Sequence, residues 1–153
     1  MLNQTTVLAI QTLLYVALQQ RKGPIAPTEI AKEFGASTAY LSKINTQLAK
    51  ANILRSHRGT KGGVTLEQDP NTITLLQVVE ACQGVVLGDY CTPCDDMDIV
   101  CSFHMAMHEL QEVIVRTLSK WTIGDLVKKP FPDASIRDQV NCRIACACRN
   151  VSE

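Results

Sequence analysis

The sequence predicts a mainly α-helical protein that contains one small β-hairpin and one long amphipathic helix. Apolar residues recur at spacings of three and four through much of residues 5–51, and again through residues 101–121. Between these regions, two short β-type segments flank a glycine-rich turn at residues 58–63. A length of 153 residues suits one compact domain with one long appended element.

The first three helices are predicted from their caps and apolar spacing. A mostly buried helix covers residues 5–19 and stops before Gly23. A short second helix starts with Pro27 in its first turn and ends at Gly35. Ser37 is a good N-cap for a third helix that runs to about Ala51. The apolar stripe of this third helix comprises Tyr40, Leu41, Ile44, Leu48 and Ile53. Together, the second and third helices form a helix-turn-helix pattern.

Residues 53–56 and 64–66 are predicted to pair as a hairpin with a basic tip. Directly after a helix-turn-helix, such a hairpin is the wing of a winged-helix domain. A further helix is predicted from Pro70 to residue 83, with Gly84 at its end. The inward-facing residues of this segment are Ile73, Leu76, Val78 and Val79.

The second half of the chain begins with a loop over residues 85–100 and continues as a long helix from Cys101 to about Trp121. A short capped segment covers residues 122–127, and Asp133 is predicted to cap a last helix that carries the C-terminal cysteines. We therefore divide the chain into a winged helix-turn-helix domain (1–84), a cysteine-rich loop (85–101), a dimerisation helix with its following segment (102–127) and a C-terminal segment (128–153). The dimer is predicted because Leu110, Ile114 and Leu118 form a stripe that a small domain cannot cover by itself.

The chain carries 15 basic and 15 acidic residues, but their distribution is uneven. Residues 1–62 contain eight Lys or Arg and two Glu, a net charge of +6, and the remaining 91 residues carry −6. This asymmetry favours a polyanion-binding module joined to a different one, and the alternative is a solvated basic face.

The second helix of a helix-turn-helix enters the major groove of DNA and presents its first turns to the base edges. The residues predicted to contact DNA there are Ser37, Thr38, Tyr40 and Lys43. The wing suits the neighbouring minor groove, where Arg58 is predicted to insert, while Lys61 contacts phosphate. The predicted partner is a double-stranded DNA operator.

Four metal-ligating side chains lie within fourteen residues, and these are Cys91, Cys94, Cys101 and His104. Thiolates favour an iron-sulfur cluster or zinc, and an imidazole can complete either site. His104 follows Cys101 by three positions and shares its helix face, and His108 is the substitute ligand one turn later. The alternatives are thiols that sense by disulfide formation without metal, and incidental thiols.

Three further cysteines near the C-terminus and one in the first domain have other interpretations. Cys82 lies on an apolar helix and is expected to be a small core residue. Metal binding, redox pairing and simple exposure all stay open for Cys142, Cys146 and Cys148.

Several function classes are disfavoured by the sequence. No run approaches the ~18 to 20 apolar residues of a membrane span, and the N-terminus lacks a signal-peptide pattern, so we expect a cytoplasmic protein without membrane contact. Nucleophile-elbow, phosphate-loop and HExxH motifs are absent, and no enzyme is predicted. A thiol redox enzyme that uses Cys91 and Cys94 lacks the accompanying βαβ pattern.

Five short motifs carry a family resemblance over about residues 5–127. They are Leu13-Leu14-Tyr15-Val16-Ala17-Leu18, Tyr40-Leu41-Ser42-Lys43-Ile44 with Gln47-Leu48, Arg58-Gly59-x-x-Gly62-Gly63, Cys101-x2-His104, and Thr122-Ile123-Gly124-Asp125-Leu126-Val127. On these motifs the sequence resembles the Rrf-type winged-helix transcriptional regulators, the family of IscR and NsrR.

The resemblance implies a homodimer paired through the long helix, with a 2Fe-2S or 4Fe-4S cluster held by three cysteines and a fourth ligand. It further implies a transcriptional repressor whose cluster responds to nitric oxide, redox state or iron supply. The family spaces its cysteines evenly, whereas the gaps here are two and six residues. The first-helix carboxylate that some relatives lend to the cluster falls near Val7 or Leu8, which cannot ligate, so the resemblance points to His104 as the fourth ligand.

Overall fold

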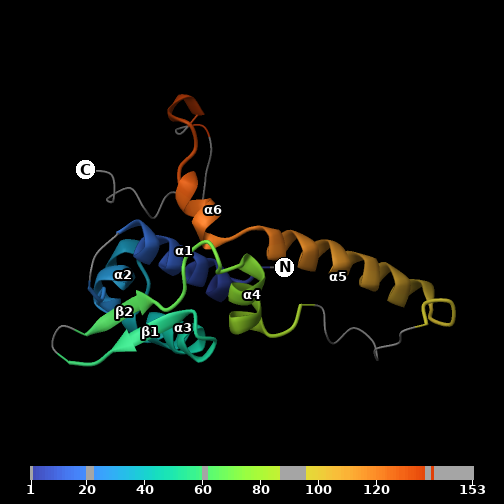
Figure 1. The fold of residues 1–153 in the computed structure, drawn as a ribbon, viewed down its shortest axis with the longest axis horizontal. Coiled ribbons are helices and arrows are strands. Elements are labelled where there is room, and N and C mark those ends of the chain that lie inside the picture. Colours follow the sequence, from blue (N-terminus) through green and yellow to red (C-terminus); the bar gives the residue numbers. More distant parts are fainter. Residues whose placement is uncertain (1, 20–22, 60–61, 87–95, 137–138, 140–153) are drawn as a thin grey trace.

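The computed structural model describes residues 2–19, 23–59, 62–86, 96–136 and 139. Within these residues the elements follow one another as a helical body, a hairpin and a long helix (Figure 1). They are α1 (Gln4–Leu18), α2 (Pro27–Phe34), α3 (Thr38–Lys50), β1 (Leu54–His57), β2 (Gly63–Leu66), α4 (Leu75–Gln83), α5 (Ser102–Lys120), α6 (Ile123–Lys128) and the 3-10 helix η1 (Ala134–Ile136). The predicted class, mainly helical with one antiparallel hairpin, is confirmed.

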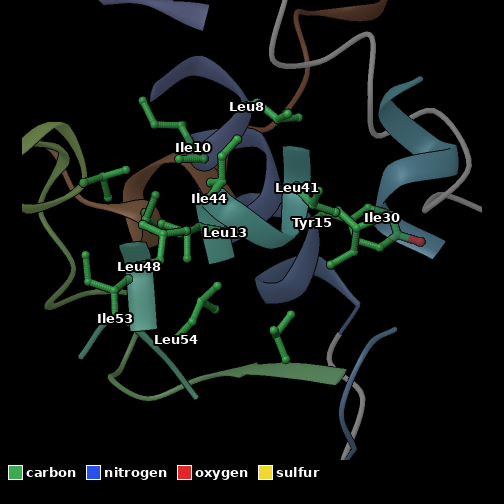
Figure 2. Close-up of a cluster of buried hydrophobic side chains, with 14 of the residues drawn as sticks. Leu8, Ile10, Leu13, Tyr15, Ile30, Leu41, Ile44, Leu48, Ile53 and Leu54 are labelled. Carbon is green, nitrogen blue, oxygen red and sulfur yellow. The ribbon is translucent and has the colours of Figure 1, made fainter. Parts of the chain in front are cut away.

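Helix α1 is the centre of the body and contacts α2, α3, α4, α6 and β2. Its residues Ala9, Leu13 and Leu14 are completely buried, as predicted for a helix that is apolar around most of its circumference. Figure 2 shows apolar side chains of α1 beside those of α3 in one continuous core. Complete burial of a leucine side chain contributes roughly 1.5–3 kcal/mol to the free energy of unfolding. The buried residues of α1 therefore hold the elements around this helix together.

The turn between α2 and α3 has the predicted geometry. Pro27 occupies the first turn of α2, and Gly35 ends the helix with a left-handed φ of 61°. Its neighbour Ala36 donates a backbone hydrogen bond to the carbonyl of Ala31. This left-handed closure reverses the chain within three residues, so that α3 starts directly after α2.

The apolar stripe predicted on α3 is buried except at one residue. Leu41, Ile44 and Leu48 are completely buried, but Tyr40 is 37% exposed. The reason is helical geometry, because Tyr40 precedes Leu41 by about 100° of rotation and lies at the edge of the buried face. A polar residue, Asn45, takes a buried position on this helix instead.

Strands β1 and β2 form the predicted antiparallel hairpin, with Leu54 opposite Leu66 and His57 opposite Gly63. The hairpin is fastened to the body by a two-bond bridge between Ile25 and Val64, whose N–H···O distances are 3.0 and 2.9 Å. The wing therefore has a fixed position relative to the helices.

Helix α4 begins at Leu75, so the predicted start at Pro70 is wrong. Residues 69–72 form a turn, in which the Asp69 carboxylate accepts a hydrogen bond from the backbone of Asn71. The helix starts where Thr74 and Gln77 form a capping box. Ile73 is completely buried as predicted, but it precedes the helix.

Helix α5 projects away from the other helices (Figure 1). Cys101 is its N-cap position and Trp121 follows its last residue, in agreement with the predicted range. The chain then returns to the other helices. Helix α6 starts with a capping box at Thr122, and its first residue, Ile123, is buried in the core. After Asp133 the structure has the short helix η1, and Cys142, Cys146 and Cys148 lie outside the described residues. Among the helices that the structure describes, none has the length and hydropathy to span a membrane.

The wing attachment leads to a stability prediction. A Cβ atom at residue 63 would collide with the backbone of Ile25, so Gly63→Ala should reduce the free energy of unfolding by about 1–3 kcal/mol. Gly23→Ala is the matched control, because no atom lies within 4 Å of its Cβ position. Urea denaturation measures both variants, and equal stability of the two would contradict the close approach of wing and body.

Candidate nucleic-acid interface and metal-ligating residues

The outward face of α3 is polar and weakly basic. Thr38, Ser42, Lys43 and Thr46 are all exposed there. Thr38 and Lys43 were predicted from the sequence, whereas Ser42 and Thr46 were missed. The missed signal is their helical spacing, since 38, 42 and 46 repeat every four residues beside the buried stripe. This face presents hydroxyl groups and one ammonium group to solvent.

Two other predicted contact residues have local structural partners. The Ser37 hydroxyl accepts a hydrogen bond from the backbone of Tyr40 at 3.2 Å and so caps α3. The Tyr40 hydroxyl lies 2.7 Å from Oγ1 of Thr5 in α1. Both residues lie at the beginning of α3, and both are exposed.

The wing brings glycines and an exposed arginine to its tip. Gly59 has a φ of 105°, and its carbonyl accepts a hydrogen bond from Gly62 at 2.9 Å. A Cβ atom at Gly62 would meet the carbonyl of His57, so the tight turn requires glycine there. Arg58 is exposed beside this turn, and Lys61 lies outside the described residues.

A second arginine of the hairpin has a different environment. Arg55 of β1 forms an ion pair with Glu67, the residue that follows β2, with an Nε···Oε2 distance of 3.0 Å. The His57 imidazole is 2.9 Å from the Thr65 hydroxyl, which ties the two strands together near the tip. Arg55 is thus partly neutralised, and these contacts brace the strands that carry Arg58.

The predicted metal-ligating residues divide between described and undescribed parts of the chain. Cys101 is an exposed free thiol at the N-cap of α5, and His104 is buried in the first turn of that helix. His108 is half-buried one turn further on. Cys91 and Cys94 lie outside the described residues, and within the described ones no three potential ligands gather around a common point.

Cys82 has the properties predicted for a core cysteine. It packs against the apolar core, and burial raises the pKa of its thiol to about 11. The thiol is therefore protonated at neutral pH, which makes it a weak nucleophile and a weak ligand.

An apolar cavity of about 590 Å³ lies between the end of α4 and the middle of α5. Its lining includes Leu2, Val79, Gln83, Leu110, Ile114 and Leu118. The predicted stripe of α5 thus forms one wall of this groove, and Leu110 remains 44% exposed.

Comparison with known proteins agrees with this architecture. Residues 2–129 match the Rrf2 family, described as "Iron-dependent Transcriptional regulator". The chain is 31% identical over 122 residues to the HTH-type transcriptional regulator IscR of Photobacterium profundum, covering 78% of this chain and 71% of that protein.

Solved structures share the fold. CymR, described as the global cysteine regulator of B. subtilis, superposes with a TM-score of 0.67 at 19% identity, covering 84% of this chain and 96% of its own. IscR of T. potens has a TM-score of 0.64 at 21% identity, with coverages of 85% and 88%.

These matches describe regulators of transcription and no enzyme, in agreement with the prediction from the sequence. The winged helix-turn-helix described above extends over most of the matched range. The chain belongs to the Rrf2 family of DNA-binding transcriptional regulators.

Proposed function

We propose that the protein is a homodimeric cytoplasmic repressor that binds a double-stranded operator and senses nitric oxide, redox state or iron supply through an iron-sulfur cluster. The observation that carries the DNA-binding part is the polar outward face of α3 next to a wing held in place by the Ile25–Val64 bridge. We call α3 the recognition helix from here on.

The chemistry of this surface suits DNA. Hydroxyl and ammonium groups on the recognition helix can donate to base edges and phosphates in the major groove. Ser37, Thr38, Tyr40 and Lys43 are the proposed contacts, Tyr40 through its ring because its hydroxyl is bonded to Thr5, with Ser42 and Thr46 added from the structure. Arg58 at the wing suits the minor groove because an exposed guanidinium is attracted by its negative potential, and Lys61 is the proposed phosphate contact.

We expect Arg58→Ala to weaken operator binding by about 1–3 kcal/mol, because it removes the cation that enters the minor groove. Lys61→Ala should instead lower affinity for all DNA sequences and flatten the salt dependence. Arg55→Ala is the matched control on the same hairpin, since Arg55 is already paired with Glu67. Fluorescence-anisotropy titrations measure all three variants, and equal losses for Arg58→Ala and Arg55→Ala would refute the minor-groove assignment.

The proposed dimer rests on α5 and the groove beside it. A helix of 19 residues extends for about 28 Å, and much of α5 is not covered by the body (Figure 1). Phe103 is 59% exposed and Met105 is 50% exposed, in addition to the groove-lining Leu110. Exposed apolar side chains along a projecting helix favour an interface, and the α5 helix of a second copy is the proposed occupant.

Ile114→Asp should therefore produce monomers, because it places a charge in the apolar groove. Arg116→Asp is the control, since Arg116 is exposed on the same helix and does not line the groove. Sedimentation velocity measures the oligomeric state, and operator titration should show lost binding only for Ile114→Asp. A monomeric wild-type protein would contradict the proposed dimer.

The proposed cluster ligands are Cys91, Cys94, Cys101 and His104. An exposed free thiol at the N-cap of α5 and an imidazole in the first turn of the helix fit such a donor set. The proposed cysteine-rich loop, residues 85–101, joins the winged domain of residues 1–84 to α5 and its following segment, residues 102–127. The C-terminal segment, residues 128–153, is proposed as a separate part. When bound, the cluster would supply a redox-sensitive and nitric-oxide-reactive centre.

Anaerobically purified protein should show the visible absorption of an iron-sulfur cluster. Cys101→Ser should abolish this absorption and give the operator affinity of cluster-free protein. Cys82→Ser should do neither, because its thiol has a pKa of about 11 and lies against the core. Equal operator affinity of cluster-loaded and cluster-free protein would refute cluster-controlled binding.

A second candidate uses the same fold with a zinc site, or with thiols that form a disulfide without metal. The exposed Cys101 thiol favours it equally, because an accessible thiol can also be oxidised directly. The visible spectrum separates the candidates, since zinc-loaded and metal-free protein are colourless, and elemental analysis then distinguishes these two.

A further inference from the structure

A hydrogen bond joins the recognition helix to the first turn of α1. Oγ1 of Thr5 and the hydroxyl of Tyr40 are 2.7 Å apart, and either group can donate. Tyr40 is the third residue of α3, within the part that meets DNA in a helix-turn-helix. The direction of its ring is therefore set partly by a residue 35 positions earlier in the chain.

The same turn of α1 is also attached to the end of α4. The backbone N–H of Asn3 donates to Oε1 of Gln83 at 3.2 Å. Gln83 is the last residue of α4, and its side chain lines the apolar groove beside α5. Residues 84–101, which include three of the proposed cluster ligands, follow it directly.

Within this turn, short-range bonds connect the two attachments. The Asn3 side chain accepts hydrogen bonds from both the backbone N–H and the hydroxyl of Thr6, at 2.9 and 3.1 Å. Thr6 is completely buried. These bonds hold Asn3 and Thr6 in one braced turn that also contains Thr5.

Two buried polar side chains of these helices do not orient the recognition helix in this way. Asn45 of α3 and Thr12 of α1 are almost completely buried, yet within the described residues their side-chain polar atoms have no hydrogen-bond partner. Apolar packing sets the distance between α1 and α3 but gives little directional restraint. The Thr5–Tyr40 bond supplies such a restraint at the DNA-reading end.

We propose that the first turn of α1, residues 3–6, positions the recognition helix and links it to the end of α4. Thr5 is the positioning residue for Tyr40, and Gln83 anchors the turn on the other side. This inference rests on the proposed DNA-binding function. A shift of the α4 end, caused by a change in the loop or in the groove, reaches Tyr40 through four consecutive residues.

The first test is a double-mutant cycle. Thr5→Val and Tyr40→Phe each remove one hydroxyl group while keeping the side-chain shape, and each should weaken operator binding about threefold to tenfold. The double variant should lose no more than either single variant, because both remove the same bond. Thr5→Ser keeps the hydroxyl group and should therefore bind the operator with wild-type affinity. Thr72→Val is the control, since it removes a comparable exposed bond to the Asp69 carbonyl in another part of the domain.

Hydrogen-deuterium exchange of the free protein tests the same bond without DNA. Thr5→Val should accelerate exchange in the first turn of α3, and Thr72→Val should not. A loss of operator affinity in Tyr40→Phe alone, with Thr5→Val unchanged, would mean that the tyrosine hydroxyl contacts DNA directly and would overturn the inference. If the wild-type protein bound no operator, the proposed function would fail, and unaltered exchange in Thr5→Val would separately refute the positioning role.

A second pair of variants tests the hydrogen bond between Asn3 and Gln83 at the end of α4. Gln83→Met removes the acceptor at similar size and should accelerate exchange in the first turns of both α1 and α3, whereas Gln83→Glu keeps an acceptor and should not. Because Gln83 also lines the groove, sedimentation velocity of both variants checks that a change in exchange does not come from an altered oligomeric state. Acceleration confined to α1 would overturn the link between the two helices.

Discussion

The burial of α1 is the constraint on which the rest of the structure depends. This helix contacts four other helices and β2, and Ala9, Leu13 and Leu14 have no exposure to solvent. Because one rigid helix forms the common packing surface, the recognition helix, the wing and α4 cannot move independently without opening apolar surface to water. The relative placement of the DNA-reading surface and the base of α5 follows from this shared core.

The apolar core determines which elements pack together, and polar contacts determine how these elements are oriented. Apolar packing is non-directional, whereas a hydrogen bond has a preferred distance and angle. The bridge between Ile25 and Val64 aligns the wing, and the capping boxes at Thr74 and Thr122 define where α4 and α6 begin. Contacts that cross between elements therefore help to decide orientation, and two of them, Ile25–Val64 and Thr5–Tyr40, hold the wing and the recognition helix.

The place of the cysteine-rich loop in the chain gives the proposed sensing a physical basis. It begins after the end of α4, a helix packed on α1, and finishes at Cys101, where α5 leaves the body. A ligand that ties residues across this segment would restrain the angle between the winged domain and α5. In a dimer paired through α5, that angle sets the separation of the two recognition helices.

The sequence by itself determined the local elements, because caps, glycine closures and apolar periodicity act over a few residues. Pro27, Gly35 and Ser37 predicted the helix-turn-helix, and the glycines of the wing predicted the hairpin. It failed at Pro70, where an aspartate turn competes with helix initiation, and it could not reveal how Tyr40 is held. Contacts such as Thr5 with Tyr40 and Asn3 with Gln83 join residues 35 and 80 positions apart, and only tertiary packing brings such residues together.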